Sequence, residues 1–74
     1  MTTLHRIRPA YNERRFYALQ IIPDLFGEVL LLRNWGRIGT GGYLRLDPYP
    51  TAQEATQALA ALVKAKTKRH YRPA

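Results

Sequence analysis

Residues 29–47 hold the pattern that most restricts the fold of this chain. Two segments, 29–38 and 43–47, each alternate between apolar and polar or aromatic side chains. The loop between them, residues 39–42, reads Gly-Thr-Gly-Gly, and glycine supplies the positive φ angles that a tight turn needs. Because residues two apart in a strand share a face, the two segments predict an antiparallel hairpin with two chemically different faces.

The two predicted faces of this hairpin differ in polarity. One face carries basic and aromatic side chains: Arg33, Trp35, Arg37, Tyr43 and Arg45. The other face carries leucines: Leu30, Leu32, Leu44 and Leu46. A leucine face favours burial beneath a second layer of structure.

Residues 51–70 are predicted to supply that second layer as a helix. Thr51 and Glu54 have the spacing of a capping box, which satisfies the first free amides of a helix. An apolar stripe at helical spacing follows: Ala52, Ala55, Leu59, Leu62 and Val63. We therefore expect one core between sheet and helix, made of Leu30, Leu32, Leu44, Leu46, Leu59 and Leu62.

Two further segments are typical of strands. Thr2 to Arg8 alternates and is stopped by Pro9, which predicts a short edge strand. Arg15 to Ile22 is rich in aromatic and β-branched residues, and both of its faces are largely apolar, as in a central strand. The predicted fold class is α+β: an antiparallel sheet of four to five strands with one C-terminal helix packed on one face. Residues 1–74 are expected to form a single domain.

The charge of the chain indicates the kind of partner. Lys and Arg number 12 against 5 Asp and Glu, a formal net charge of +7. Such an excess favours an anionic partner, most commonly nucleic acid, although a basic surface can also serve solubility alone. No stretch approaches the ~20 apolar residues of a spanning helix, and no charged-then-apolar leader opens the chain. We expect a cytoplasmic location and no membrane partner.

The inventory of side chains argues against catalysis. The chain has no Cys and no Ser, and its two histidines, His5 and His70, stand near opposite termini. A Ser or Cys nucleophile paired with His is therefore impossible, and two isolated histidines do not form a metal site. The five acidic residues form no close pair in sequence. We expect a protein that is not an enzyme and that has no metal and no cofactor.

Trp35 is the centre of the candidate binding site. An aromatic ring between Arg33 and Arg37 suits stacking on a base or sugar with phosphates held alongside. A lone Trp in a small domain is also often a core residue, so both interpretations stay open. The basic C-terminal tail is either a solvated helix end or, with Arg14 and Arg15, a second phosphate-contacting patch. The candidate nucleic-acid-binding residues are Trp35, Arg37, Arg33, Arg14, Arg15, Arg45, Tyr43, Lys66 and Lys68.

Three motifs in order resemble the WGR domain family. The run Trp35-Gly36-Arg37 carries the family's name. Residues 15–20, Arg-Phe-Tyr-Ala-Leu-Gln, are similar to its Lys-Phe-Tyr-x-x-Gln strand. Residues 66–68, Lys-Thr-Lys, followed by Tyr71, are similar to its closing run. The resemblance implies the WGR fold.

The family is best known inside DNA-damage-dependent poly(ADP-ribose) polymerases, where the domain helps to recognise a DNA break. The resemblance implies that Trp35 stacks on the sugar of a terminal nucleotide and that Arg37 holds nucleic acid or a neighbouring domain. Arg14 stands where the polymerases have an Asn that contacts the DNA end, and no transferase region follows within residues 1–74. The hypothesis is a non-catalytic module that binds DNA ends or nicks. The alternative is a protein-interaction module that docks through the same Trp and Arg face.

Overall fold

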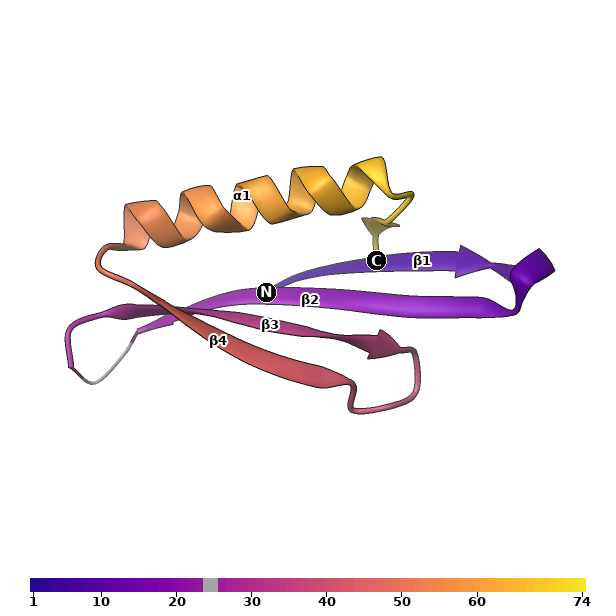
Figure 1. The fold of residues 1–74 in the computed structure, drawn as a ribbon, viewed down its shortest axis with the longest axis horizontal. Coiled ribbons are helices and arrows are strands. Elements are labelled where there is room, and N and C mark those ends of the chain that lie inside the picture. Colours follow the sequence, from indigo (N-terminus) through magenta and orange to yellow (C-terminus); the bar gives the residue numbers. More distant parts are fainter. Residues whose placement is uncertain (24–25) are drawn as a thin grey trace.

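The protein forms one antiparallel sheet with a single α-helix on one face (Figure 1). The structure is a computed structural model, and it describes residues 1–23 and 26–74. The elements in chain order are β1 (Thr2–Arg8), η1 (Pro9–Tyr11), β2 (Glu13–Pro23), β3 (Val29–Arg37), β4 (Tyr43–Tyr49), α1 (Ala52–Lys68) and β5 (Arg72–Pro73). The strand order in the sheet is β4-β3-β2-β1-β5. The predicted α+β class, with its antiparallel sheet and C-terminal helix, is confirmed.

Strand β1 has the predicted bounds but does not form the edge of the sheet along its whole length. It pairs with β2 on one side, and at Leu4 and His5 it pairs with β5 on the other. The backbone N–H of Ala74 also donates to the carbonyl of Thr3 at 3.0 Å. The prediction of an edge strand is wrong at these positions, because a two-residue strand is too short to leave a periodic pattern in the sequence.

Strands β3 and β4 form the hairpin that the glycine loop predicts. Gly39 and Gly42 have φ angles of +95° and +67°, the left-handed region that glycine adopts without strain. The loop also passes close to β3, because a Cβ atom on Gly36 would lie 2.8 Å from the Cα atom of Gly42. Gly36, between Trp35 and Arg37, is therefore required by close backbone packing.

Helix α1 begins where the capping pattern predicts. The Thr51 hydroxyl accepts a hydrogen bond from the N–H of Glu54 at 3.2 Å. At the other end, the N–H groups of His70 and Tyr71 donate to the carbonyls of Thr67 and Lys66. His70 has a φ of +71°, so the chain reverses there in a Schellman turn. This reversal directs Tyr71 into the core, where it is buried.

The core lies between α1 and the face of the sheet opposite to the one predicted. The buried cluster consists of Leu4, Tyr17, Leu19, Leu31 and Tyr71. The partly buried side chains packed against it are Ile21, Trp35, Tyr49, Ala58, Leu59, Leu62 and Val63. The helix therefore covers the basic and aromatic face of the hairpin. The contribution of Leu59 and Leu62 is confirmed, but the placing of Leu30, Leu32, Leu44 and Leu46 in this core is wrong.

Strand β2 decides which face the helix covers. Its buried residues Tyr17 and Leu19 lie directly opposite Trp35 and Arg33 in the β2–β3 pairing. Leu31 lies on this same face and is fully buried. The stripe on α1 differs from the predicted one only at its first turns: Ala55 is buried as expected, Ala58 also packs on the core, and Ala52 is exposed. Alternation in the hairpin separates the two faces correctly, but it does not show which one the helix meets.

Candidate nucleic-acid interface

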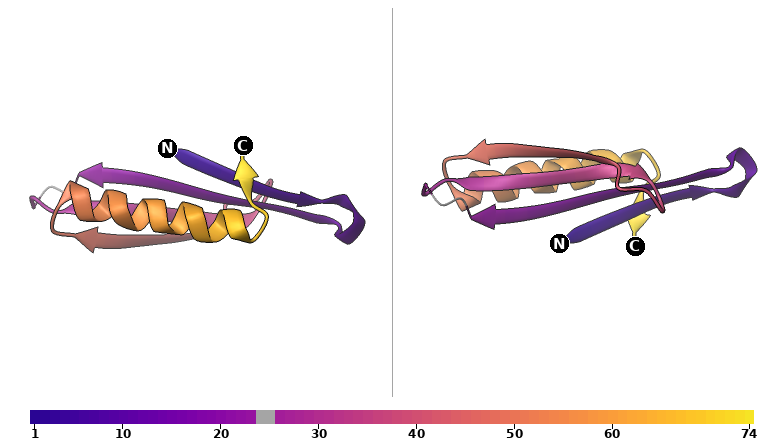
Figure 2. Two further views of the ribbon diagram at one scale, coloured as in Figure 1. Left: turned by 90° about the horizontal axis from the view of Figure 1, so that it is seen from above. Right: turned by 90° about the horizontal axis from the view of Figure 1, so that it is seen from below.

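The sheet extends past the C-terminal end of α1 (Figures 1 and 2). The turn between β1 and β2 projects furthest, and the loop between β3 and β4 lies at the same end of the sheet but projects less far. At this end of the sheet the register pairs Arg15 with Arg37 and Trp35 with Tyr43. These four residues share the helix-side face, at the end that the helix leaves open.

Trp35 is half-buried, with neighbours of two kinds. Its ring stacks on the buried ring of Tyr17, with 5.8 Å between centroids and 17° between planes. It also lies 6.0 Å from the ring of Tyr43, which is 70% exposed. Trp35 therefore packs on the core and faces solvent at once, so each of the two interpretations left open by the sequence describes part of its environment.

A hollow lies at the open end of the sheet, and we call it the end hollow. Arg14, Arg15, Arg37, Trp35 and Tyr43 contribute to its lining, and it has a volume of about 470 Å³. The three arginines are exposed. Five of the predicted site residues thus come together on one surface.

A second hollow lies between the sheet and the last turns of α1, and we call it the cradle. Its lining consists of five cations and three aromatic residues: Arg6, Arg15, Arg33, Lys66, Arg69, Tyr17, Trp35 and Tyr71. Lys66 Nζ lies 4.5 Å from the centroid of the Tyr17 ring, and the Arg6 guanidinium lies 5.0 Å from that of Tyr71. Because Arg15 and Trp35 line both hollows, the cradle and the end hollow form one continuous surface.

Partial burial and the neighbouring cations of the cradle both affect the pKa of Lys66. Partial burial, together with repulsion from Arg69, Arg33 and Arg6, lowers the pKa of Lys66 below its usual value. An anion held among these groups would offset the repulsion and raise the pKa of Lys66 again. The cradle therefore has the electrostatic character of an anion site.

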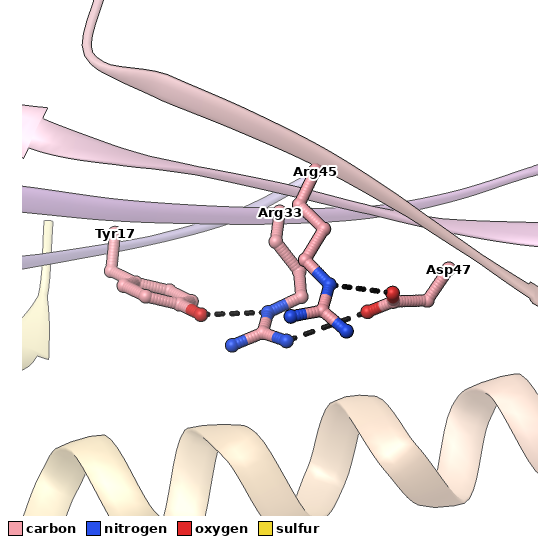
Figure 3. A network of polar contacts seen from close by, with 4 residues as sticks. All are labelled: Tyr17, Arg33, Arg45 and Asp47. Carbon is pink, nitrogen blue, oxygen red and sulfur yellow. Dashed lines mark hydrogen bonds and ion pairs between the residues drawn. The ribbon is translucent and has the colours of Figure 1, made fainter.

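Arg33 and Arg45 are held by one carboxylate (Figure 3). Arg33 Nε donates to the hydroxyl of Tyr17 at 2.8 Å, and its Nη1 donates to Asp47 at 3.4 Å. Arg45 Nε donates to the other oxygen of Asp47 at 2.8 Å. The hydrogen bond from Arg45, supported by Arg33, lowers the pKa of Asp47 despite partial burial. Arg33 and Arg45 thus share a carboxylate, which offsets part of their positive charge.

The helix separates two lysines that the sequence places together. Lys66 points into the cradle, whereas Lys68 is exposed and lines neither hollow. Two residues along an α-helix correspond to a rotation of about 200°, so both side chains cannot face the sheet. Arg45 also lies outside both hollows.

Four residues that line the cradle are not in the predicted set: Arg6, Tyr17, Arg69 and Tyr71. Arg6 lies opposite Arg15 in the β1–β2 pairing and forms an ion pair with Glu13. The sequence does contain a signal for Arg6. It stands two residues after Leu4 in β1, and residues two apart in a strand share a face of the sheet. Strand alternation gives no signal for Tyr71, because the position of its side chain depends on the chain reversal at His70.

Within residues 1–23 and 26–74, no three side chains of the metal-ligating types come together as a metal ion would require. No helix in this described part of the chain is long and apolar enough to cross a membrane.

The fold and this surface define a small α+β domain with a basic and aromatic end. The chain belongs to the WGR domain family, whose model matches residues 1–74. This family is associated with nucleic-acid binding in proteins similar to the poly(ADP-ribose) polymerases.

The chain is also similar to a bacterial protein, the uncharacterized protein y4dW of Sinorhizobium fredii (strain NBRC 101917 / NGR234). The two are 41% identical over 70 residues, which cover 95% of this chain and 34% of that protein. The chain thus spans about a third of the length of this curated relative. A comparison with solved structures found no match.

Proposed function

We propose that this domain is a non-catalytic module that binds DNA at ends or nicks, through Trp35, Arg37 and their basic neighbours. The observation that carries the proposal is the junction of the end hollow and the cradle at Trp35. The half-buried indole of Trp35 stands there between two groups of cations. Aromatic stacking and phosphate contacts on one surface are the combination that nucleic-acid binders use.

Several cations of this surface remain available to an external anion. Among the described residues the ion pairs are Arg6 with Glu13, and Arg33 and Arg45 with Asp47. Arg14, Arg15 and Arg37 take part in none of them. These three exposed arginines surround the end hollow, where Arg can pair with phosphate in a bidentate manner.

The position of Trp35 favours a terminus or nick over intact duplex. Bases inside a duplex are already stacked on each other, so a protein ring reaches a sugar or base face most easily where the stack is interrupted. The surface lies at the projecting end of an elongated molecule, which is 45 Å in its longest dimension. A module of this shape can present Trp35 to the end of a duplex and place the cradle along the backbone. The chain has no Cys and no Ser, which supports a binding role without catalysis.

The test is a titration of the 74-residue chain against blunt, nicked, single-stranded and closed-circular DNA at several salt concentrations. We expect tighter binding to blunt and nicked DNA than to closed circles. Arg37→Ala should weaken binding and reduce the slope of log K against log salt by about 0.9 if Arg37 neutralises one phosphate. Lys64→Ala removes one positive charge from an exposed helix position outside both hollows, and it is the matched control.

Equal binding to all four DNAs, with equal losses in Arg37→Ala and Lys64→Ala, would contradict recognition of ends and leave only general electrostatic attraction. Absence of DNA binding at low salt would overturn the proposal as a whole. The same Trp35 and Arg37 surface would then be assigned to docking on a protein, for which a Trp and Arg pair at a surface is well suited.

A further inference from the structure

The face of the sheet that points away from α1 is apolar and open. Figure 2 (right) shows the sheet from this side, with no described element in front of it. Register pairs place Leu32 opposite Leu46 and Ile22 opposite Leu30 on this face. Leu44 and Leu46, two residues apart on β4, are 63% and 48% exposed, and Ile7, on β1, is 50% exposed. Exposed apolar side chains that cluster on one face, as Leu44 and Leu46 do beside Leu32, are typical of an interaction site.

The open face also lacks the charge that characterises the rest of the protein. Its strand residues from β1 to β4 are Thr3, His5, Ile7, Arg14, Phe16, Ala18, Gln20, Ile22, Leu30, Leu32, Asn34, Gly36, Leu44, Leu46 and Pro48. Arg14 is the one residue of this set that belongs to the 12 Lys and Arg of the chain. Arg72 of β5 shares the register position of His5, but its guanidinium donates to the carbonyls of Thr67 and Tyr71. Depletion of charge at the centre of a surface distinguishes protein interfaces from other protein surfaces.

We infer that a second copy of this chain covers the open face, and that the two sheets pack against each other in a symmetric dimer. The inference does not depend on the proposed function, because the leucines of the open face line neither the cradle nor the end hollow. Seen from this side, the molecule measures 45 Å by 14 Å, an outline of about 630 Å² (Figure 2, right). Specific interfaces bury about 600–1,000 Å² from each partner, so a dimer would use nearly the whole of this face.

The chemistry of the face favours a copy of the same chain over a charged partner. A surface that is apolar along its length is complementary to itself under a twofold axis, as a symmetric dimer requires. Two packed sheets lie about 10 Å apart, which would enclose Leu32, Leu44 and Leu46 of both copies. The open edge strand β4 is less suited to pairing with another edge, because Pro48 within it has no N–H to donate.

Salt should strengthen this association. Each copy carries a net charge of +7, so two copies repel each other over long range while their apolar faces attract. Added salt screens the repulsion but does not weaken the attraction that comes from burial of the leucines. Phosphate binding has the opposite dependence on salt. The two proposals can therefore fail independently.

The test is equilibrium sedimentation of the 74-residue chain across the micromolar range at low and high salt. We expect a dimer of twice the 8.5 kDa chain mass, with tighter association at high salt. Leu46→Glu and Leu44→Glu each place a carboxylate on the face and should weaken the dimer by at least about tenfold. Ala61→Glu also replaces an apolar residue by a carboxylate, but on the exposed surface of α1. It should leave the dimer unchanged. Circular dichroism of each variant checks that the fold is retained.

A monomer throughout the micromolar range would overturn the inference, and so would equal weakening by Leu46→Glu and Ala61→Glu. Hydrogen exchange separates the proposed packing from pairing at the sheet edge. Face-to-face packing leaves the outward amides of β4 exchanging rapidly in the dimer. Their protection on dimerisation would show edge pairing and overturn the inference as well.

Discussion

Asp47 shows how a single carboxylate organises the basic face of the sheet. It is the acceptor for both Arg33 and Arg45, and through Arg33 it is connected to the hydroxyl of Tyr17. The side chain of Asp47 is about a fifth exposed, so these contacts are only partly screened by solvent. Asp47 therefore holds the guanidinium of Arg33 against the core, while Arg37, four residues further along β3, stays exposed.

The lowered pKa of Asp47 predicts how stability depends on pH. Because the folded protein favours the ionised carboxylate, the stabilisation is fully present above its ordinary pKa of 3.8. It is lost as the pH falls through the lower pKa of the folded state. In urea unfolding at a series of pH values, we expect the free energy of unfolding to decline below about pH 4, and to decline less in Asp47→Asn. Glu28→Gln is the control, since Glu28 is exposed and makes no ion pair in the described part of the chain. Parallel pH profiles for the parent and Asp47→Asn would contradict this role of Asp47.

At the scale of elements, the C-terminal end of α1 determines the shape of the cradle. The reversal at His70 returns Tyr71 to the sheet, where its ring lies 6.3 Å from that of Tyr17 in an edge-to-face arrangement. Strand β5 follows directly and pairs with β1. One non-glycine residue with φ at +71° thus links the helix, the aromatic lining of the cradle and the last strand.

His70 is accordingly a position at which the protein can be stabilised. A Cβ atom is unfavourable in the left-handed region, and glycine removes that penalty at some cost in the entropy of the unfolded chain. We expect His70→Gly to raise the free energy of unfolding by about 0.5–1 kcal/mol in urea melts. His70→Ala loses the same imidazole but keeps the Cβ atom, so it should give no comparable gain. Equal stability of the two variants would show that backbone strain at residue 70 is absent.

The elements themselves could be predicted from sequence because their ends carry distinct signals. Pro9, the glycine loop at 39–42 and the capping residue Thr51 each mark a boundary that the structure confirms. The face of the sheet that meets α1 could not be predicted, because leucines on one side of the hairpin compete with tyrosine and tryptophan on the other. The register between β2 and β3 settles that choice, and register is a long-range property.

The candidate site was predictable to a similar extent. The alternation of β3 and the family motif indicated Trp35 and Arg37, and the structure places both at the end hollow. Arg33 shares their face, but it is held by Tyr17 and Asp47, contacts that depend on side-chain packing. The cradle was harder to foresee, because its residues come from β1, β2, β3, α1 and the turn after α1 and meet only in the folded protein.

At the scale of the whole molecule, the two faces of the sheet separate two kinds of interaction. The helix-side face carries the charge of the strands, with Arg15, Arg33, Arg37 and Arg45 among its cations. The opposite face carries exposed leucines. If two copies pack through their open faces, their basic surfaces point in opposite directions, and a dimer that binds DNA through these surfaces can hold two DNA molecules at once.

This arrangement predicts bridging of DNA ends by the dimer. A blunt duplex fixed on beads should retain a second, labelled blunt duplex when the parent protein is added in limiting amount. Leu46→Glu should bind single duplexes with the affinity of the parent but retain much less labelled duplex, because its protomers separate. Arg37→Ala should also retain less labelled duplex, because its dimer forms but each protomer binds DNA weakly. Retention by Leu46→Glu equal to that of the parent would show that bridging does not require the open face.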